Sequence, residues 1–155
     1  MKYIILVLAI FFSACSVKEY ENTQTKIIII KSPKIKFADV GYIKNTDKAV
    51  ELELFIAGKV IDRISINHLI CLSEGCMSKS GFNKDYLHSS YPDEILQNIL
   101  LGSEIYDGIN KLKTDTGFEQ RIESIDVNIV YKVNNDSIFF KDKKNNIIFK
   151  IKNTK

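Results

Sequence analysis

Residues 125–151 read IDVNIVYKVNNDSIFFKDKKNNIIFKI, and this stretch decides the fold. Apolar and polar residues alternate along it with a period of two, which is the pattern of strands that bury one face. Short turn-like segments rich in Asn, Asp and Lys divide it into three apolar runs, 125–133, 138–140 and 147–151. Three consecutive strands with short turns predict an antiparallel meander at the C-terminal end.

Strand patterns also occupy the first half of the chain. Residues 50–56 alternate apolar side chains with Glu51 and Glu53, and Gly58-Lys59 suits a two-residue hairpin turn. The return strand is expected to carry Val60, Ile64 and Ile66 on one face. Residues 27–30 are four consecutive isoleucines, which favours a strand covered on both faces.

A helical pattern interrupts the strands between these halves. Pro92 is followed by two acidic residues, which suit the first turn of a helix. Four apolar residues then share one helical face, and Gly102 ends the segment; they are Ile95, Leu96, Ile99 and Leu100. The sequence therefore predicts a single, mainly β (α+β) domain over residues 26–155, with a helical insertion around 84–102.

The first fifteen residues predict export and lipid attachment. Lys2 precedes a ten-residue apolar run, 3–12, which is too short for a permanent span of about 20 residues and is typical of a signal peptide. Phe12-Ser13-Ala14-Cys15 resembles a bacterial lipobox. We therefore expect a signal peptide over residues 1–14, lipidation of Cys15 and a tether over 15–25. By analogy with bacterial lipoprotein sorting, Ser16 favours the outer membrane, with the domain facing the periplasm.

The two cysteines of the body, Cys71 and Cys76, are expected to form a disulfide, since an exported protein meets an oxidising compartment. A metal site that combines both thiolates with His68 and His88 is the alternative, although zinc sites usually show tighter C-x₂-C pairing. Loop-closure arithmetic assigns so short a ring about 2 kcal/mol, so it fixes a local loop rather than the whole domain.

Composition and motifs exclude several classes of function. Of 22 basic residues only Arg63 and Arg121 are arginines, the net charge is +3, and carboxylates are interspersed, so nucleic-acid binding is not predicted. The chain has no nucleophile elbow, phosphate loop, dinucleotide fingerprint or zinc-protease motif. We expect no catalytic residues, no resident metal and no cofactor.

The order of these features is similar to that of the LolB family, outer-membrane lipoproteins that accept other lipoproteins from a periplasmic carrier and insert them into the membrane. Four stretches carry the resemblance: 13–17, 50–67, 91–102 and 136–152. The resemblance implies a half-open antiparallel barrel with helices inside and a cavity for acyl chains. It also implies an exposed membrane-insertion loop, for which Asn67-His68-Leu69 makes Leu69 the candidate, although His68 stands where that loop has proline.

Two functional hypotheses follow. In the first, one or two short helices pack on the concave face of a curved antiparallel sheet and leave an apolar cavity. There the four residues Ile95, Leu96, Ile99 and Leu100 would contact acyl chains or lipoproteins; a filled core is the alternative for them, and a buried strand end is the alternative for Leu69. In the second, an immunoglobulin-like β-sandwich tethered by Cys15 scaffolds a cell-envelope complex.

Overall fold

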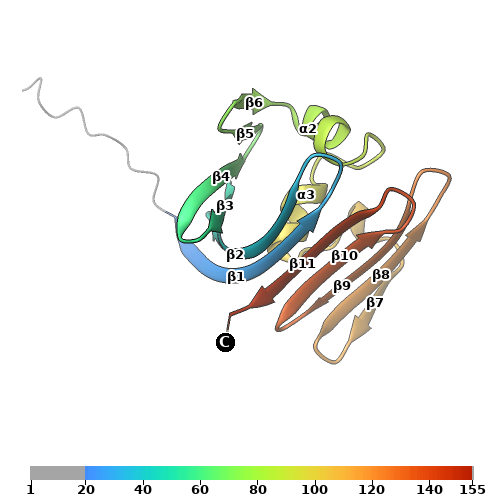
Figure 1. Cartoon of the computed structure of the whole chain (residues 1–155). Helices are drawn as coiled ribbons and strands as arrows, with labels where there is room; N and C mark the ends of the chain where they lie inside the picture. Colours follow the sequence, from blue (N-terminus) through green and yellow to red (C-terminus); the bar gives the residue numbers. More distant parts are fainter. Residues whose placement is uncertain (1–19, 155) are drawn as a thin grey trace, which may run out of the picture.

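The computed structural model of the chain describes residues 20–154, so the predicted signal peptide (1–14) and Cys15 lie outside the described residues. Eleven strands form one antiparallel sheet in the order β6-β5-β4-β3-β2-β1-β11-β10-β9-β8-β7. The sheet is strongly curved and partly surrounds two short α-helices (Figure 1). The predicted curved sheet with helices is confirmed, and the sandwich is not found, because every described strand belongs to a single sheet.

The elements follow one another along the chain with short connections. Their bounds are β1 Asn22–Lys31, β2 Lys36–Asn45, β3 Val50–Ile56, β4 Lys59–Ile66, β5 Ile70–Leu72, β6 Gly75–Met77, α2 Lys79–Tyr86, α3 Ile95–Leu101, the 3₁₀ turn η2 Tyr106–Gly108, β7 Lys111–Thr114, β8 Gly117–Glu123, β9 Asn128–Asn134, β10 Ser137–Asp142 and β11 Ile147–Asn153.

The C-terminal meander is formed by β9, β10 and β11 as predicted, but its first strand begins at Asn128 rather than at Ile125, which lies in the preceding bend and is 87% exposed. Phe140 of β10 lies opposite Tyr131 of β9 and Phe149 of β11, and all three are buried. β11 then pairs with β1, with Phe149 opposite Ile30, so the two ends of the described chain meet in the middle of the sheet. This long-range pairing makes one continuous sheet from the two halves of the sequence.

The hairpin of β3 and β4 departs from the prediction at its tip. Ile64 and Ile66 are buried as expected, but Val60 is 47% exposed. Between β3 and β4 the register shifts at Leu54/Phe55, so that Phe55 faces Val60 and one extra residue turns Val60 to the outer face. The two turn residues are Ala57 and Gly58, both with positive φ, as a type I′ turn requires, rather than Gly58-Lys59.

Strand β1 is covered on one face only. Ile28 and Ile30 are buried, whereas Ile27 and Ile29 are 42% and 37% exposed. The expectation of burial on both faces is wrong, because both helices pack on the concave side and the described residues leave the outer side uncovered (Figure 1). β1 also begins at Asn22, so the last residues of the expected tether (15–25) belong to the sheet.

The helical insertion covers the concave face. It begins at Lys79, before the predicted residue 84, where Ser78 caps α2 by accepting a hydrogen bond from Gly81 N. Helix α3 begins at Ile95 rather than at Pro92, and ends as predicted at Gly102, which adopts a left-handed conformation. The apolar face of α3 is completely buried in the core; it consists of Ile95, Leu96, Ile99 and Leu100.

Two buried polar side chains fix the insertion to the sheet. Asp142 accepts hydrogen bonds from Tyr91 Oη at 2.8 Å, from Asn145 Nδ2 at 2.7 Å and from the backbone N–H of Asn128 at 3.1 Å. Gln120 Oε1 accepts from the backbone N–H of Ile105. Burial opposes ionisation of Asp142, but the hydrogen bonds it accepts outweigh that effect and hold its pKa below the usual range.

Replacing Asp142 by alanine is therefore expected to lower the free energy of unfolding by about 3 kcal/mol, because buried donors lose their acceptor. Denaturant unfolding at neutral pH measures the change. Asp115→Ala, at an exposed turn, is the control and should be close to neutral. An equal effect of the two variants would contradict the role of Asp142.

The same carboxyl predicts how stability changes with pH. Since its pKa is depressed in the folded state, its contribution is present above the unfolded-state pKa of about 3.9 and is lost as the pH falls through the folded value. The wild-type protein should lose more stability than Asp142→Asn as the pH is lowered below about 4. Parallel pH profiles for the two proteins would show that Asp142 is not the source.

Candidate functional site

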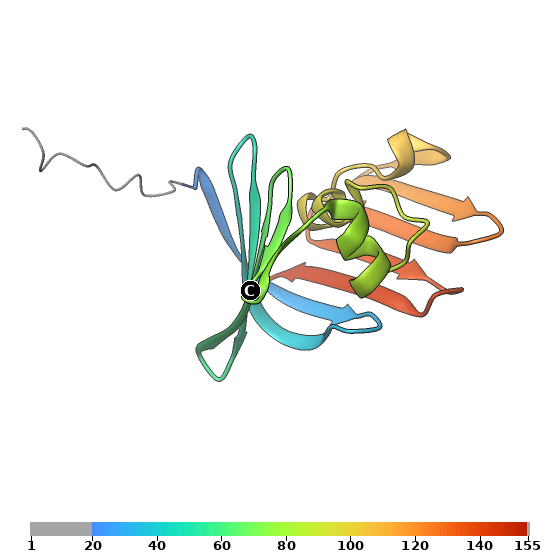
Figure 2. The same ribbon diagram turned by 90° about the horizontal axis from the view of Figure 1, so that it is seen from above.

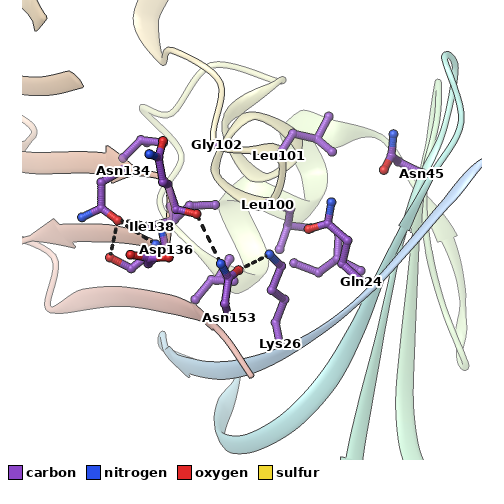
Figure 3. Close-up of a pocket in the computed structure, with 15 residues that line it drawn as sticks. Gln24, Lys26, Asn45, Leu100, Leu101, Gly102, Asn134, Asp136, Ile138 and Asn153 are labelled. Carbon is purple, nitrogen blue, oxygen red and sulfur yellow. Dashed lines mark hydrogen bonds between the residues drawn. The ribbon is translucent and has the colours of Figure 1, made fainter. Parts of the chain in front are cut away.

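A pocket of about 190 Å³ opens at one end of the groove between α3 and the sheet (Figure 3). Its floor is apolar and comes from β2, α3, β9, β10 and β11. The floor residues are Ile43, Leu100, Val133, Ile138 and Ile151, and Leu101 stands at the rim with 40% of its surface exposed. The remaining lining is polar, so the pocket combines an apolar interior with a hydrophilic entrance.

The polar entrance is held together by its own hydrogen bonds. Lys26 Nζ donates to Asn153 Oδ1 at 2.6 Å, and Asn153 Nδ2 donates to the carbonyl of Asn135 at 3.3 Å. Asn134 Oδ1 accepts from Ser137 Oγ at 3.1 Å and from the backbone of the turn that follows it. Partial burial lowers the pKa of Lys26 from its ordinary value. These contacts fix the entrance before any ligand arrives.

Gly102 lets the end of α3 approach the β9–β10 pair. Its φ is +67°, and a Cβ at this position would lie 3.2 Å from both Ile138 Cδ1 and Val133 Cγ1. A side chain here would be strained in its backbone and would push against the pocket floor. The glycine that ends the helix in the sequence therefore also shapes one wall of the pocket.

Of the four α3 residues predicted to meet acyl chains, Leu100 lines this pocket. Ile95, Leu96 and Ile99 lie in the core cluster that fills the space between helix and sheet. The interior of the curved sheet is therefore largely packed, and this pocket lies at the end of the interior rather than within it. Contact of all four residues with acyl chains stays a prediction.

The predicted insertion loop lies at the same ends of the strands as the entrance of this pocket. The register pairs Asn22 with Asn45, Asn45 with Val50 and Val50 with Ile66. The start of β1 and the loop after β4 therefore lie at the same end of the strands. Figure 2 shows this loop, between β4 and β5, on the side where β1 begins. Leu69 is half-buried there, and its N–H donates to Asn67 Oδ1 at 2.9 Å.

An ion-pair cluster lies on the outer face of β3, where the sequence pattern indicated only strand alternation. Glu53 contacts Arg63 Nη2 at 2.7 Å and Lys44 Nζ at 2.8 Å. Burial opposes ionisation of Glu53, but its hydrogen bonds to Lys44 and Arg63 lower the pKa below the ordinary value. Glu51 accepts a hydrogen bond from Tyr20 Oη at 2.7 Å, which fastens the beginning of the described chain to the sheet.

Cys71 and Cys76 form the predicted disulfide, with an S–S distance of 2.06 Å, across the β5–β6 hairpin. Both sulfurs are therefore engaged with each other rather than available to the alternative metal site with His68 and His88. Within residues 20–154, no group of three or more His, Cys, Asp or Glu side chains could hold a metal ion. Over the same residues no helix is long and apolar enough to cross a bilayer.

The sequence did not reveal the pocket entrance. Gln24, Lys26, Asn45 and Asn153 come from β1, β2 and β11, and the pairing of β1 with both β2 and β11 brings them together. The one local signal was the turn chemistry of Asn134-Asn135-Asp136, which forms the remaining side of the entrance. Comparison of the chain with protein-family models, curated proteins and solved structures finds no match.

Removal of the Cys71–Cys76 disulfide is expected to lower the free energy of unfolding only slightly. A Cys71→Ala/Cys76→Ala variant should lose about 2 kcal/mol of unfolding free energy, because the closed loop is short. Reduction of the wild-type protein is the matched control and should give the same loss in denaturant unfolding. Failure of the double variant to fold would show instead that the disulfide holds the domain together.

Proposed function

We propose that this protein is a lipid-anchored, non-enzymatic lipoprotein of the outer membrane that binds acyl chains and takes part in lipoprotein delivery or insertion. The observation that carries the proposal is the pocket at the mouth of the curved sheet, with its apolar floor and polar entrance. Acyl chains or lipoproteins would be its ligands, a periplasmic carrier would supply them, and Cys15 would bear the anchor.

The chemistry of the pocket suits the end of an acyl chain. Each buried methylene contributes about 0.8 kcal/mol, and the floor offers side chains without polar atoms. At about 190 Å³ the pocket is smaller than the roughly 300–1,000 Å³ of drug-sized sites, so it accommodates a short stretch of chain. A longer stretch requires the exposed end of α3, at Leu101, to move away from the entrance.

The position of the pocket also favours this function. Its entrance lies at the end of the strands where β1 begins, and Cys15 is only seven residues before Asn22. A chain of that length spans at most about 25 Å. A lipid on Cys15 would therefore keep the pocket entrance and the loop of Leu69 close to the membrane surface.

A second candidate function is an interaction module for a cell-envelope complex. The edge strand β7 favours it, because Lys111–Thr114 is exposed along its whole length and pairs only with β8. Such an edge can accept a strand from a partner. Two of its four residues are lysines, a common protection against edge-to-edge pairing, so this surface supports the proposal less than the pocket supports the first.

Acyl binding is tested with residues 16–155, which include every strand and helix of the described fold. Titration with an environment-sensitive fatty-acid probe should give saturable binding. Leu101→Glu should weaken that binding at least tenfold, because it places a charge at the rim of the apolar pocket. Leu112→Glu is the control, since Leu112 is 66% exposed on β7, away from the pocket.

Two outcomes would contradict acyl binding. One is no saturable signal at high protein concentration. The other is equal probe affinity for Leu101→Glu and the wild-type protein, which would place the probe elsewhere. Competition of the probe by an intact lipoprotein, but not by its delipidated form, would link the pocket to lipoprotein delivery.

Leu69 is tested by transfer rather than by binding. Leu69→Glu should slow the movement of a lipoprotein from the protein into vesicles and leave probe affinity unchanged, because Leu69 lies outside the pocket. His68→Glu, at the exposed neighbouring position, controls for the added charge. Normal transfer by Leu69→Glu would show that this loop is not the insertion element.

A further inference from the structure

The outer face of the adjacent strands β2, β1, β11, β10 and β9 carries an unusual combination of side chains. Residues directly opposite each other on paired strands point to the same side of a sheet. On this side, Ile27 lies opposite Val40 and Lys152, and Ile29 lies opposite Lys150. We call this surface the outer lysine face and define it by Ile27, Ile29, Lys31, Lys36, Val40, Lys141, Lys150 and Lys152.

The charges on the outer lysine face are all of one sign. In β2, β1, β11, β10 and β9, each of them wholly described, the outward positions hold no carboxylate. On the flanking strands, Glu53 pairs with Lys44 and Arg63, and Glu119 pairs with Arg121 and Lys132. Glu123, at the end of β8, is the outward carboxylate there without an ion pair among the described residues. None of the five lysines of the face forms an ion pair with another described residue. The face therefore presents uncompensated positive charge.

Apolar side chains lie between these lysines. Ile27, Ile29 and Val40 are 42%, 37% and 38% exposed, on neighbouring strands. The solvent side of an antiparallel sheet is ordinarily polar, so three exposed β-branched side chains on neighbouring strands are consistent with a surface that contacts another apolar phase. Lys150 Nζ also lies 5.7 Å from the ring centroid of Phe139, on the same side. The face thus alternates cationic groups with short apolar ones.

We propose that the outer lysine face docks on the anionic phosphate headgroups of a lipid bilayer. Lysine ammonium groups meet phosphates as point charges, and their long stems let the isoleucines between them reach the boundary of the acyl region. Lysine without arginine is a weaker match for nucleic-acid recognition, which favours the planar guanidinium. Docking of this face does not depend on the pocket or on acyl binding.

The face is also placed where a membrane attachment would be reinforced. β1, which carries Ile27 and Ile29, is the first strand of the described chain. A lipid and a basic surface together give stable attachment where either alone is marginal. The proposed anchor and the outer lysine face would therefore act on the same membrane.

Co-sedimentation of residues 16–155 with lipid vesicles tests the proposal. We expect binding to phosphatidylcholine vesicles that contain phosphatidylglycerol, little binding to phosphatidylcholine alone, and loss of binding at high salt. Lys150→Glu/Lys152→Glu should reduce binding at least about 25-fold, since each lysine contributes about fivefold. Lys113→Glu/Lys143→Glu makes the same charge change at exposed sites off this face and should retain most of the binding.

A second pair of variants keeps the test informative if charge reversal disturbs folding. Lys150→Gln/Lys152→Gln should show an intermediate loss of binding with an unchanged circular dichroism spectrum. The proposal is overturned by equal binding to both vesicle types, or by equal losses in the two charge-reversal pairs. It is also overturned if sedimentation shows that the face joins two copies of the chain, so that Lys150→Glu/Lys152→Glu changes the oligomeric state instead of lipid binding.

Discussion

The aromatic cluster around Phe140 connects the sheet to its helical insertion, and the other features depend on it. The ring centroid of Phe140 lies 5.9 Å from that of Phe149, 6.2 Å from that of Tyr131 and 6.0 Å from that of Tyr91. Tyr91 belongs to the connection between α2 and α3, and its hydroxyl donates to Asp142. The cluster thus holds the insertion against the concave face. As a result the sheet is packed on its concave face and open to solvent on its convex face.

This one-sided packing divides the molecule into two surfaces with different physical character. On the concave side, the apolar face of α3 fills the interior, and Gly102 lets its end come close enough to leave only a small opening. On the convex side, Ile27 and Ile29 stay exposed because nothing in the described chain covers them. The pocket and the outer lysine face are therefore consequences of the same arrangement.

Much of the fold could be predicted from local patterns. The meander of β9, β10 and β11, the buried face of α3, the stop at Gly102 and the Cys71–Cys76 disulfide each depend on side chains close in sequence, although the meander begins at Asn128 rather than at Ile125. The two predictions that were wrong, for Val60 and for strand β1, also have physical reasons. An extra residue in β4 reverses Val60, and a period-two pattern cannot reveal such an insertion. A run of consecutive isoleucines, as in β1, is compatible with a strand covered on one face or on both, so the sequence does not decide between them.

The candidate site was harder to predict than the fold. Its floor was partly anticipated through Leu100, but its entrance is assembled by the pairing of β1 with β11, whose partners Lys26 and Asn153 are far apart in sequence. The buried bonds of Gln120 and Asp142 were equally invisible, because a polar residue in a strand normally indicates solvent. Local sequence signals do not specify long-range convergence of this kind.

The central claim, that the mouth of the curved sheet receives an acyl chain, is tested most directly by locating one. Paramagnetic broadening of the amide resonances of residues 16–155 by a spin-labelled fatty acid reports which residues the chain approaches. Broadening confined to the pocket, at Gly102, Gln24 and the turn 134–137, is the predicted result. Broadening confined to β7, or spread evenly over the surface, would contradict the claim.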